Sequence, residues 1–207
     1  LLGFERMRED EIQPGSYLFQ LGGTHEVGRK QLHQIYVHGA DSTNSRTVTE
    51  AKLAGRKLVL KKLRDAKGEK RLMHLQPEPG FRESYRIVGE TMITVNDYTG
   101  GRVFDDAVCH AFYPVDLHTR TGVKPKPLKP GIVPTIPLRA LIPKGSRNLM
   151  VAGRSVSSDR LANSGLRVQA PCMAMGQAAA ATAVLAARAN TTPLAVPLSD
   201  IHGLLSE

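Results

Sequence analysis

The stretch from Asn148 to Ala187 places the strongest constraint on how this chain folds. It begins with a short apolar run, Leu149 to Ala152, whose lack of polar–apolar alternation is typical of a buried strand. Gly153 ends the run, and small polar residues then predict a loop to about Leu166. A helix is expected from Gln169 or Pro171 to about Arg188, because proline is tolerated in a first helical turn.

This predicted helix consists largely of small residues. Alanine occupies most of its faces, which predicts tight packing on several sides. Its amino-terminal end would present N–H groups and a partial positive charge, suited to an anion or to an electron-rich ring oxygen. Arg167 precedes that end and would strengthen it. The segment from Ala170 to Ala187 is also the one stretch that resembles a membrane span, but its interior Gly, Gln and Thr favour a buried soluble helix.

Elsewhere the pattern indicates a mixed α/β chain. Two short β-like runs, Tyr17 to Leu21 and Gln34 to His38, flank Gly22 and Gly23. Thr47 and Glu50 have the spacing of a capping box, and the apolar positions that follow predict a helix that stops near Gly68. A strand or turn is expected around residues 81–90, a short segment at Thr94 to Tyr98, and β-rich chain from Arg102 to Val115 with a turn at Asp105 and Asp106.

Proline marks a change of organisation between Gly122 and Pro143. Six prolines in this stretch exclude helix and favour stiff extended chain, as expected of a connection between domains. We place the domain boundary here and predict a first region over residues 1–135 and a second over 136–207. A ligand for a proline-binding module is the alternative.

The formal charge of +9 raises the question of nucleic-acid binding. Tryptophan is absent, and the main basic cluster, Lys57 to Arg71, is interleaved with Leu and Val at helical spacing, which favours a solvated helix face. We therefore expect no nucleic-acid partner, although a basic binding module without catalysis stays open as an alternative. Two distant cysteines, Cys109 and Cys172, form neither a disulfide framework nor a zinc pattern, so no metal site is expected.

Several ordered motifs resemble one family. The segment AGRSVSSDRLANSGLRVQAPCMAMGQAA is similar to the carboxy-terminal flavin-contacting segment of FAD-dependent oxidoreductases related to fumarate reductase and glutathione reductase flavoproteins. RESYRIVGE, the run DAVxxxxYPVDLH that ends at His118, and PLRALIPKGSRNLMVAGR follow the same order as in that family. The resemblance covers about residues 78–189, and the rest more weakly.

The resemblance implies a fold and an FAD cofactor. Residues 1–135 would form an α+β cap or substrate domain, and residues 136–207 would supply the last strand and helix of a Rossmann-like FAD-binding domain. The final helix would point its start at the flavin pyrimidine, where reduction places negative charge. Gly153 and Arg154 would lie on the ribityl-phosphate side, and Ser157, Arg167, Val168 and Gln169 near the isoalloxazine. Structural ion pairs are the alternative for Arg154 and Arg167.

Three departures from the family pattern stand out. Tyr85 occupies a position that usually holds a second Arg, and Ala180 one that usually holds Gly. No G-x-G-x-x-G occurs in the sequence, although this motif binds the FAD pyrophosphate at the first strand–helix turn. With a start that lacks Met, this leads us to expect the carboxy-terminal portion of a longer flavoprotein, completed by an upstream half. A remnant of the fold without cofactor is the alternative.

Substrate chemistry is expected from polar residues inside these motifs. An Arg can hold a substrate carboxylate in bidentate fashion, and a His can move a proton alongside hydride transfer. The candidate catalytic residues are His118, Arg82 and Arg139, acting on an unidentified small substrate with an unknown electron partner, in a chain that can also form oligomers. The alternatives are a hydrogen-bonded structural role for His118 and, for Arg82 and Glu83, pairing with each other's neighbours.

Overall fold

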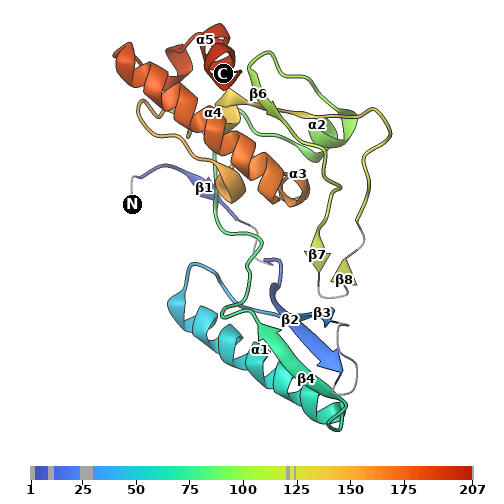
Figure 1. Cartoon of the computed structure of the whole chain (residues 1–207). Coiled ribbons are helices and arrows are strands. Elements are labelled where there is room, and N and C mark those ends of the chain that lie inside the picture. Colours follow the sequence, from blue (N-terminus) through green and yellow to red (C-terminus); the bar gives the residue numbers. More distant parts are fainter. Residues whose placement is uncertain (1–2, 9–11, 24–29, 120–121, 124, 207) are drawn as a thin grey trace. The chain divides into compact units, whose positions relative to one another are not determined.

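The computed structural model describes residues 3–8, 12–23, 30–119, 122–123 and 125–206 (Figure 1). The chain divides into two compact units. One comprises residues 1–10, 85–117 and 123–207, and the other residues 11–84 and 118–122. The two regions predicted from the proline-rich stretch, 1–135 and 136–207, stay a prediction beside this division.

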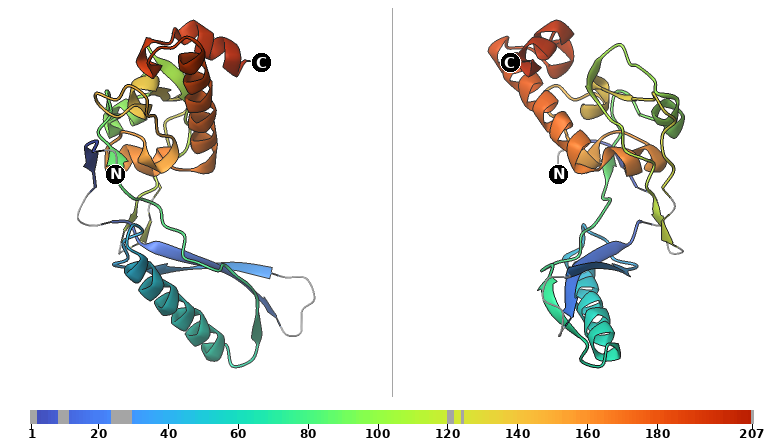
Figure 2. Two further views of the ribbon diagram at one scale, coloured as in Figure 1. Left: turned by 90° about the vertical axis from the view of Figure 1, so that its left-hand side faces the viewer. Right: turned by 45° about the vertical axis from the view of Figure 1, so that its right-hand side comes forward.

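The smaller unit is a three-stranded antiparallel sheet with one helix on it. Its strands have the order β3-β2-β4, and the helix α1 crosses one face (Figure 2). The elements are β2 (Gly15–Gly23), β3 (Lys30–Val37), α1 (Ser45–Asp65), β4 (Lys70–Leu75) and β7 (His118–Thr119). Both predicted strands are thereby confirmed, although each is longer than expected; residues 24–29 lie outside the described residues.

Alternation along β2 explains why α1 lies on one face of this sheet. Tyr17, Phe19 and Leu21 are fully or almost fully buried, because successive strand residues point to opposite faces and these three point the same way. Ala51 and Val59 on α1 are buried in turn. The remaining faces of α1 are exposed, so the part of the basic cluster on this helix is a solvated helix face, as predicted, whereas Lys70 and Arg71 lie on β4.

The predicted capping box at Thr47 and Glu50 is wrong. The N-cap lies three residues earlier, at Asn44, whose side chain accepts hydrogen bonds from the N–H groups of Arg46 and Thr47. The Thr47 hydroxyl instead donates to the carbonyl of Asp41, at 2.8 Å, and accepts from the Asp41 N–H. Asn is as good an N-cap as Thr, and here the loop recruits the Thr for itself. Gly68, with φ of +84°, does follow the helix end.

The larger unit contains the remaining elements. They are β1 (Arg6–Met7), β5 (Arg86–Ile87), α2 (Val95–Gly100), β6 (Ala107–His110), β9 (Thr135–Pro137), the 3₁₀ helices η1 (Leu138–Leu141), η2 (Gly153–Ser155) and η3 (Pro193–Ala195), and the helices α3 (Arg160–Leu166), α4 (Gln169–Arg188) and α5 (Leu198–Leu205). β1 pairs with β5 and β6 with β9, while β8 (Gly122–Val123) pairs with β7 where the division between the units falls.

Two predictions in this unit are confirmed. Three are wrong: a proline-rich stretch free of helix, a loop from Gly153 to Leu166, and a strand at Leu149–Ala152. The helix α4 and the turn at Asp105–Asp106 occur as expected. The proline-rich stretch is not free of helix, because η1 starts directly after Pro137, which serves as its N-cap. The loop predicted between Gly153 and Leu166 contains α3, capped by the Asp159 side chain, which accepts from the Ala162 N–H.

The strand predicted at Leu149–Ala152 is not formed. The segment is extended, and the N–H of Val151 donates to the carbonyl of Leu141 at 2.8 Å, but it joins no strand ladder among the described residues. An apolar run favours extended backbone, yet a strand also needs a neighbouring strand to pair with. The segment is half-buried or exposed rather than buried.

Helix α4 buries one face rather than all of its faces. Met175, Ala178 and Thr182 are among its buried residues, whereas Met173 is 69% exposed. Ala180 is exposed, so its methyl group presses on no neighbour in the part of the chain described here. By length and composition α4 is apolar enough to cross a membrane, and 33% of its most apolar stretch is buried inside the protein.

Candidate functional site

The start of α4 offers backbone donors to a ligand. Val168 is the N-cap and makes no side-chain capping hydrogen bond. The first N–H that bonds within the turn is that of Cys172, to the carbonyl of Val168 at 3.1 Å, and Pro171 has no N–H. The N–H groups of Gln169 and Ala170, both exposed residues, therefore remain at the positive end of a 20-residue helix.

A tight turn lies directly against this helix end. Gly153 has φ of +77°, and a Cβ placed on it would lie 3.6 Å from Sγ of Cys172 in the first turns of α4. Asn163, which is fully buried, donates from Nδ2 to the carbonyl of Arg154 at 3.2 Å. The structure thus brings together the two stretches that the sequence singled out for cofactor binding, Gly153–Arg154 and Arg167–Gln169.

Two arginines make this helix end electropositive. Burial raises the pKa of the Cys172 thiol, while the charges of Arg154 and Arg167 oppose that rise, so both guanidinium groups act on the same first turns. The Arg167 side chain is 9% exposed, and its Nη2 donates to the carbonyl of Asp116 at 2.8 Å. Arg154 is exposed. One cation is therefore fixed and the other faces solvent.

Ser157 lies behind this surface rather than on it. The residue is fully buried, and its Oγ accepts a hydrogen bond from the Gly89 N–H at 3.0 Å. Gly89 has to be glycine here, because an added Cβ would lie 2.7 Å from the Cβ of Ser157. The Ser157 hydroxyl thereby joins the RESYRIVGE motif to the segment before α3.

Arg139 is engaged by two carboxylates. Its Nε and backbone N–H both donate to Oδ2 of Asp106 at 2.9 Å, and its Nη2 donates to Oδ1 of Asp106 at 3.0 Å and also to Asp105. Burial disfavours the charged form of Asp106, but the hydrogen bonds and charge of Arg139 outweigh it, so the pKa of this carboxyl lies below its usual value. This fork-to-fork pair ties η1 to the turn before β6.

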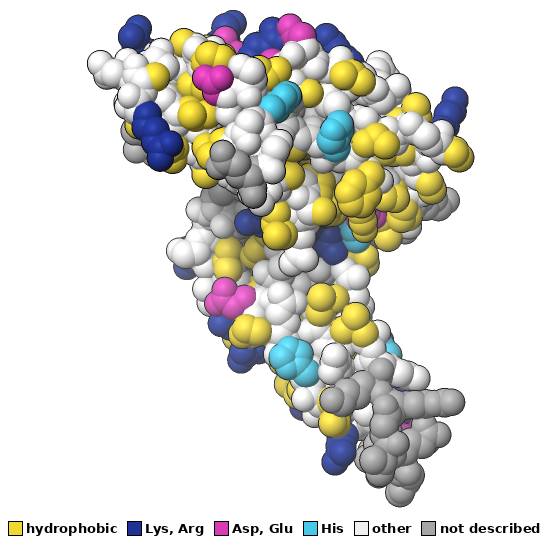
Figure 3. Space-filling view, turned by 45° about the horizontal axis from the view of Figure 1, so that its top comes forward, with side chains coloured by type: hydrophobic (Ala, Val, Ile, Leu, Met, Phe, Trp, Pro, Cys, Tyr) yellow, Lys and Arg dark blue, Asp and Glu magenta, His cyan; other side chains and the backbone are white. Residues whose placement is uncertain are grey.

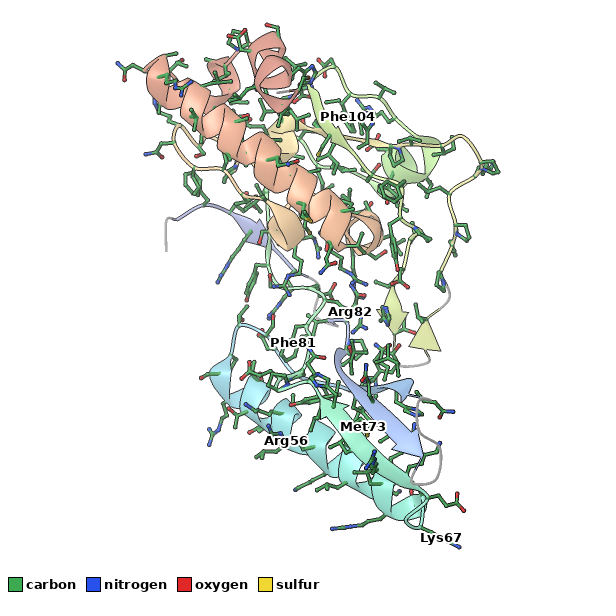
Figure 4. All side chains as sticks on the ribbon, viewed as in Figure 1. Arg56, Lys67, Met73, Phe81, Arg82 and Phe104 are labelled. Atoms are coloured by element: carbon green, nitrogen blue, oxygen red, sulfur yellow. The ribbon has the colours of Figure 1, made fainter. Side chains whose placement is uncertain are left out.

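His118 and Arg82 belong to a polar cluster in the smaller unit. His118 is 7% exposed, and its Nδ1 lies 3.1 Å from the hydroxyl oxygen of Tyr36 on β3. Arg82, labelled in Figure 4, donates from Nη1 to the carbonyl of Pro14 and to Oγ of Ser16, both at 3.1 Å. Its guanidinium carbon lies 5.7 Å from the centre of the Tyr36 ring.

Gln13 joins this cluster to Glu83. Its Nε2 donates to Oε2 of Glu83 at 3.0 Å, its backbone N–H donates to Oε1, and its Oε1 accepts from the His118 N–H at 3.0 Å. The sequence motifs did not point to Gln13 or Tyr36, which lie 105 and 82 residues from His118. Among the described residues, no group of three His, Cys, Asp or Glu side chains is placed to hold a metal ion.

A comparison with protein-family models decides the family. The model described as FAD dependent oxidoreductase matches residues 7–205. The chain belongs to this family. No curated protein and no solved structure matches it. Its mixed α/β fold is that of an FAD-dependent oxidoreductase, and the cofactor that the family implies is FAD.

The residues of this oxidoreductase fit the flavin end of FAD. The N–H groups of Gln169 and Ala170 lie at a helix start beside two cations, which suits the ring edge that gains negative charge on reduction. The left-handed φ of +77° at Gly153 is one that glycine adopts readily and other residues rarely do. The glycine motif that would hold the pyrophosphate does not occur in the sequence.

Proposed function

We propose that this chain is the carboxy-terminal portion of an FAD-dependent oxidoreductase that transfers hydride or electrons between flavin and a small substrate. The observation that carries the proposal is the start of α4, which has no side-chain cap and lies beside Arg154, Arg167 and the Gly153 turn. FAD, when bound, supplies the redox chemistry, and the helix end and two cations stabilise its reduced form.

Two further observations support the carboxy-terminal placement. The pyrophosphate-binding glycine motif does not occur in the sequence, so residues outside it would hold that part of FAD. Residues Leu149–Ala152 are extended yet join no strand ladder among the described residues, as expected of a strand whose neighbour belongs to an upstream half. We propose that this half completes the FAD domain.

On the substrate side, we propose His118 as the proton-transfer residue and Arg82 as the anion-binding residue. Each lies near Tyr36 in one polar cluster, and an imidazole and a guanidinium together can bind an anionic substrate and exchange a proton with it. Arg139 has no part in the proposed site, because Asp105 and Asp106 hold its guanidinium.

The test is the reduction potential of the flavin-loaded, full-length protein. Arg167→Ala removes a cation beside the flavin, so we expect a lower flavin content and a lower reduction potential. The expected shift is about 30 mV, which corresponds to a tenfold change in the equilibrium constant of a two-electron couple. Arg154→Ala should act in the same direction and carries less risk for folding, because Arg154 is exposed. Arg188→Ala, on an exposed residue at the far end of the same helix, is the matched control. Unchanged flavin content and potential in both site variants would refute the proposed cofactor site.

A further inference from the structure

Tyr36 and His118 form a hydrogen-bonded pair inside the smaller unit. The Tyr36 hydroxyl oxygen and Nδ1 of His118 are 3.1 Å apart, within hydrogen-bond distance. The ring centres are 5.7 Å apart and the ring planes are tilted by 60°. The rings therefore meet through their polar edges instead of stacking.

The position of His118 is fixed independently through its backbone. The backbone N–H of His118 only donates, so the Gln13 atom that it meets at 3.0 Å is Oε1. The Nε2 of Gln13 then faces Glu83, whose Oε2 accepts from it at 3.0 Å. Gln13 and Glu83 are 2% and 3% exposed, so water competes little for these bonds. Gln13 therefore holds the backbone of His118, and Tyr36 contacts its ring.

We infer that Tyr36 is a positioning residue that holds neutral His118 with its proton on Nε2. The bond made by one ring nitrogen decides which nitrogen of a neutral imidazole carries the proton. A phenol is a better donor than acceptor, so its O–H directed at Nδ1 leaves the proton on Nε2. When the ring becomes charged, Nδ1–H donates to the same oxygen, and the imidazole keeps its place while Nε2 gains and loses its proton.

This inference rests on the proposed function, in which His118 moves a proton. Charged and titratable groups near the pair include Arg82, His38 and Glu83. The Arg82 guanidinium carbon lies 5.7 Å from the Tyr36 ring centre, the His38 ring lies 6.4 Å from it, and Glu83 acts through Gln13. None of these supplies the hydrogen bond to Nδ1 that Tyr36 makes, so its hydroxyl is the group to remove.

The experiment is a two-bond nitrogen–proton correlation spectrum of the histidine rings in this 207-residue chain, recorded where His118 is neutral. His118→Gln identifies the His118 signals by their loss. The wild-type ring should be in the Nε2–H form. In Tyr36→Phe the ratio of the two neutral forms should move toward Nδ1–H by about fivefold, the effect of one ordinary hydrogen bond. Tyr113→Phe, in the other unit, is the matched control.

The outcomes separate this inference from the proposed function. An unchanged tautomer ratio in folded Tyr36→Phe, checked by amide dispersion, overturns the inference. In the flavin-loaded full-length protein, Tyr36→Phe should lower kcat about fivefold at constant KM and alter its pH profile. Unchanged turnover in His118→Gln would instead refute the proposed role of His118, whatever the tautomer ratio.

Discussion

Arg139 donates to Asp106 from its backbone N–H and from its guanidinium, and the two together fix the geometry of the pair. Its place inside a family motif made it a candidate for binding substrate, but the carboxylates that hold it lie 33 and 34 residues away and carry no sequence signal of pairing. Arg167 is held by the Asp116 carbonyl and lies 3.9 Å from one oxygen of the Asp116 carboxylate, while its charge also acts on the first turns of α4. Both arginines have a carboxylate partner, and they differ in that Asp105 and Asp106 bind the guanidinium of Arg139 at several atoms, whereas the Asp116 carboxylate lies 3.9 Å from Arg167.

We expect Asp106→Asn to lower the free energy of unfolding by about 1 kcal/mol at pH 7, as a charge-assisted pair with a half-exposed partner would. The pKa of Asp106 in the folded protein lies below the ordinary 3.8. Its contribution is therefore present above that value and is lost as the pH falls through the lower folded value. Urea unfolding at pH 7 and near pH 3 should show that the variant and the wild type differ less in free energy of unfolding at the lower pH. Asp105→Asn, at a side chain that is 82% exposed, should have a smaller effect, and equal effects at pH 7 would contradict this assignment.

At the scale of elements, sequence patterns were sufficient for α4, for the existence of α1 and for β2 and β3. For α1, β2 and β3 the spacing of apolar residues is visible in the sequence, whereas α4 was recognised from its run of small helix-forming residues and its single buried face was not predicted. Helix α3 was missed because its seven residues include Ser164 and Gly165, which are typical of loops. Gly165 is required by a distant contact, since an added Cβ would lie 2.6 Å from the hydroxyl oxygen of Tyr98. Such contacts override local propensity and do not appear in it.

Two helical glycines make a matched pair for testing whether a distant contact overrides local helix propensity. In α1, a Cβ on Gly55 would lie 2.2 Å from Cδ2 of the fully buried Tyr17, whereas in α4 a Cβ on Gly176 would meet nothing within 4 Å. Gly55→Ala should therefore destabilise the protein by about 1–3 kcal/mol through overpacking. Gly176→Ala should stabilise it by about 0.5–1 kcal/mol through helix propensity. Chemical denaturation measures both, and a loss of stability in Gly176→Ala as large as in Gly55→Ala would show that the close approach of Tyr17 is not the cause.

At the scale of the whole molecule, the candidate residues fall into two groups. Gly153, Arg154, Ser157 and the residues from Arg167 to Gln169 belong to the larger unit, and His118 and Arg82 to the smaller one. The resemblance in motifs predicted both groups. It did not predict Gln13 or Tyr36, because the fold brings them to His118 from distant parts of the chain. Partners of a site residue follow from tertiary structure, which a single sequence does not display.

The charge of +9 also belongs to the whole molecule, and we predict that it does not signify nucleic-acid binding. In the view of Figure 3, Lys and Arg side chains are scattered among apolar and uncharged ones and form no continuous track. On α1, exposed Lys57, Lys61 and Arg64 alternate with exposed Leu53 and Leu60, so no aromatic platform for bases accompanies the charge.

A surface that follows phosphates releases counterions, and its binding persists at moderate salt while falling steeply as salt increases. Scattered charge gives only weak attraction at low salt. We therefore expect an electrophoretic shift assay at about 0.15 M salt, where the Debye length is about 8 Å, to show no complex of duplex DNA or RNA with micromolar protein. Weak retardation at low salt should disappear in a Lys57→Glu, Lys61→Glu variant. Saturable binding at the higher salt would favour a basic binding module over the flavoenzyme as the role of this surface.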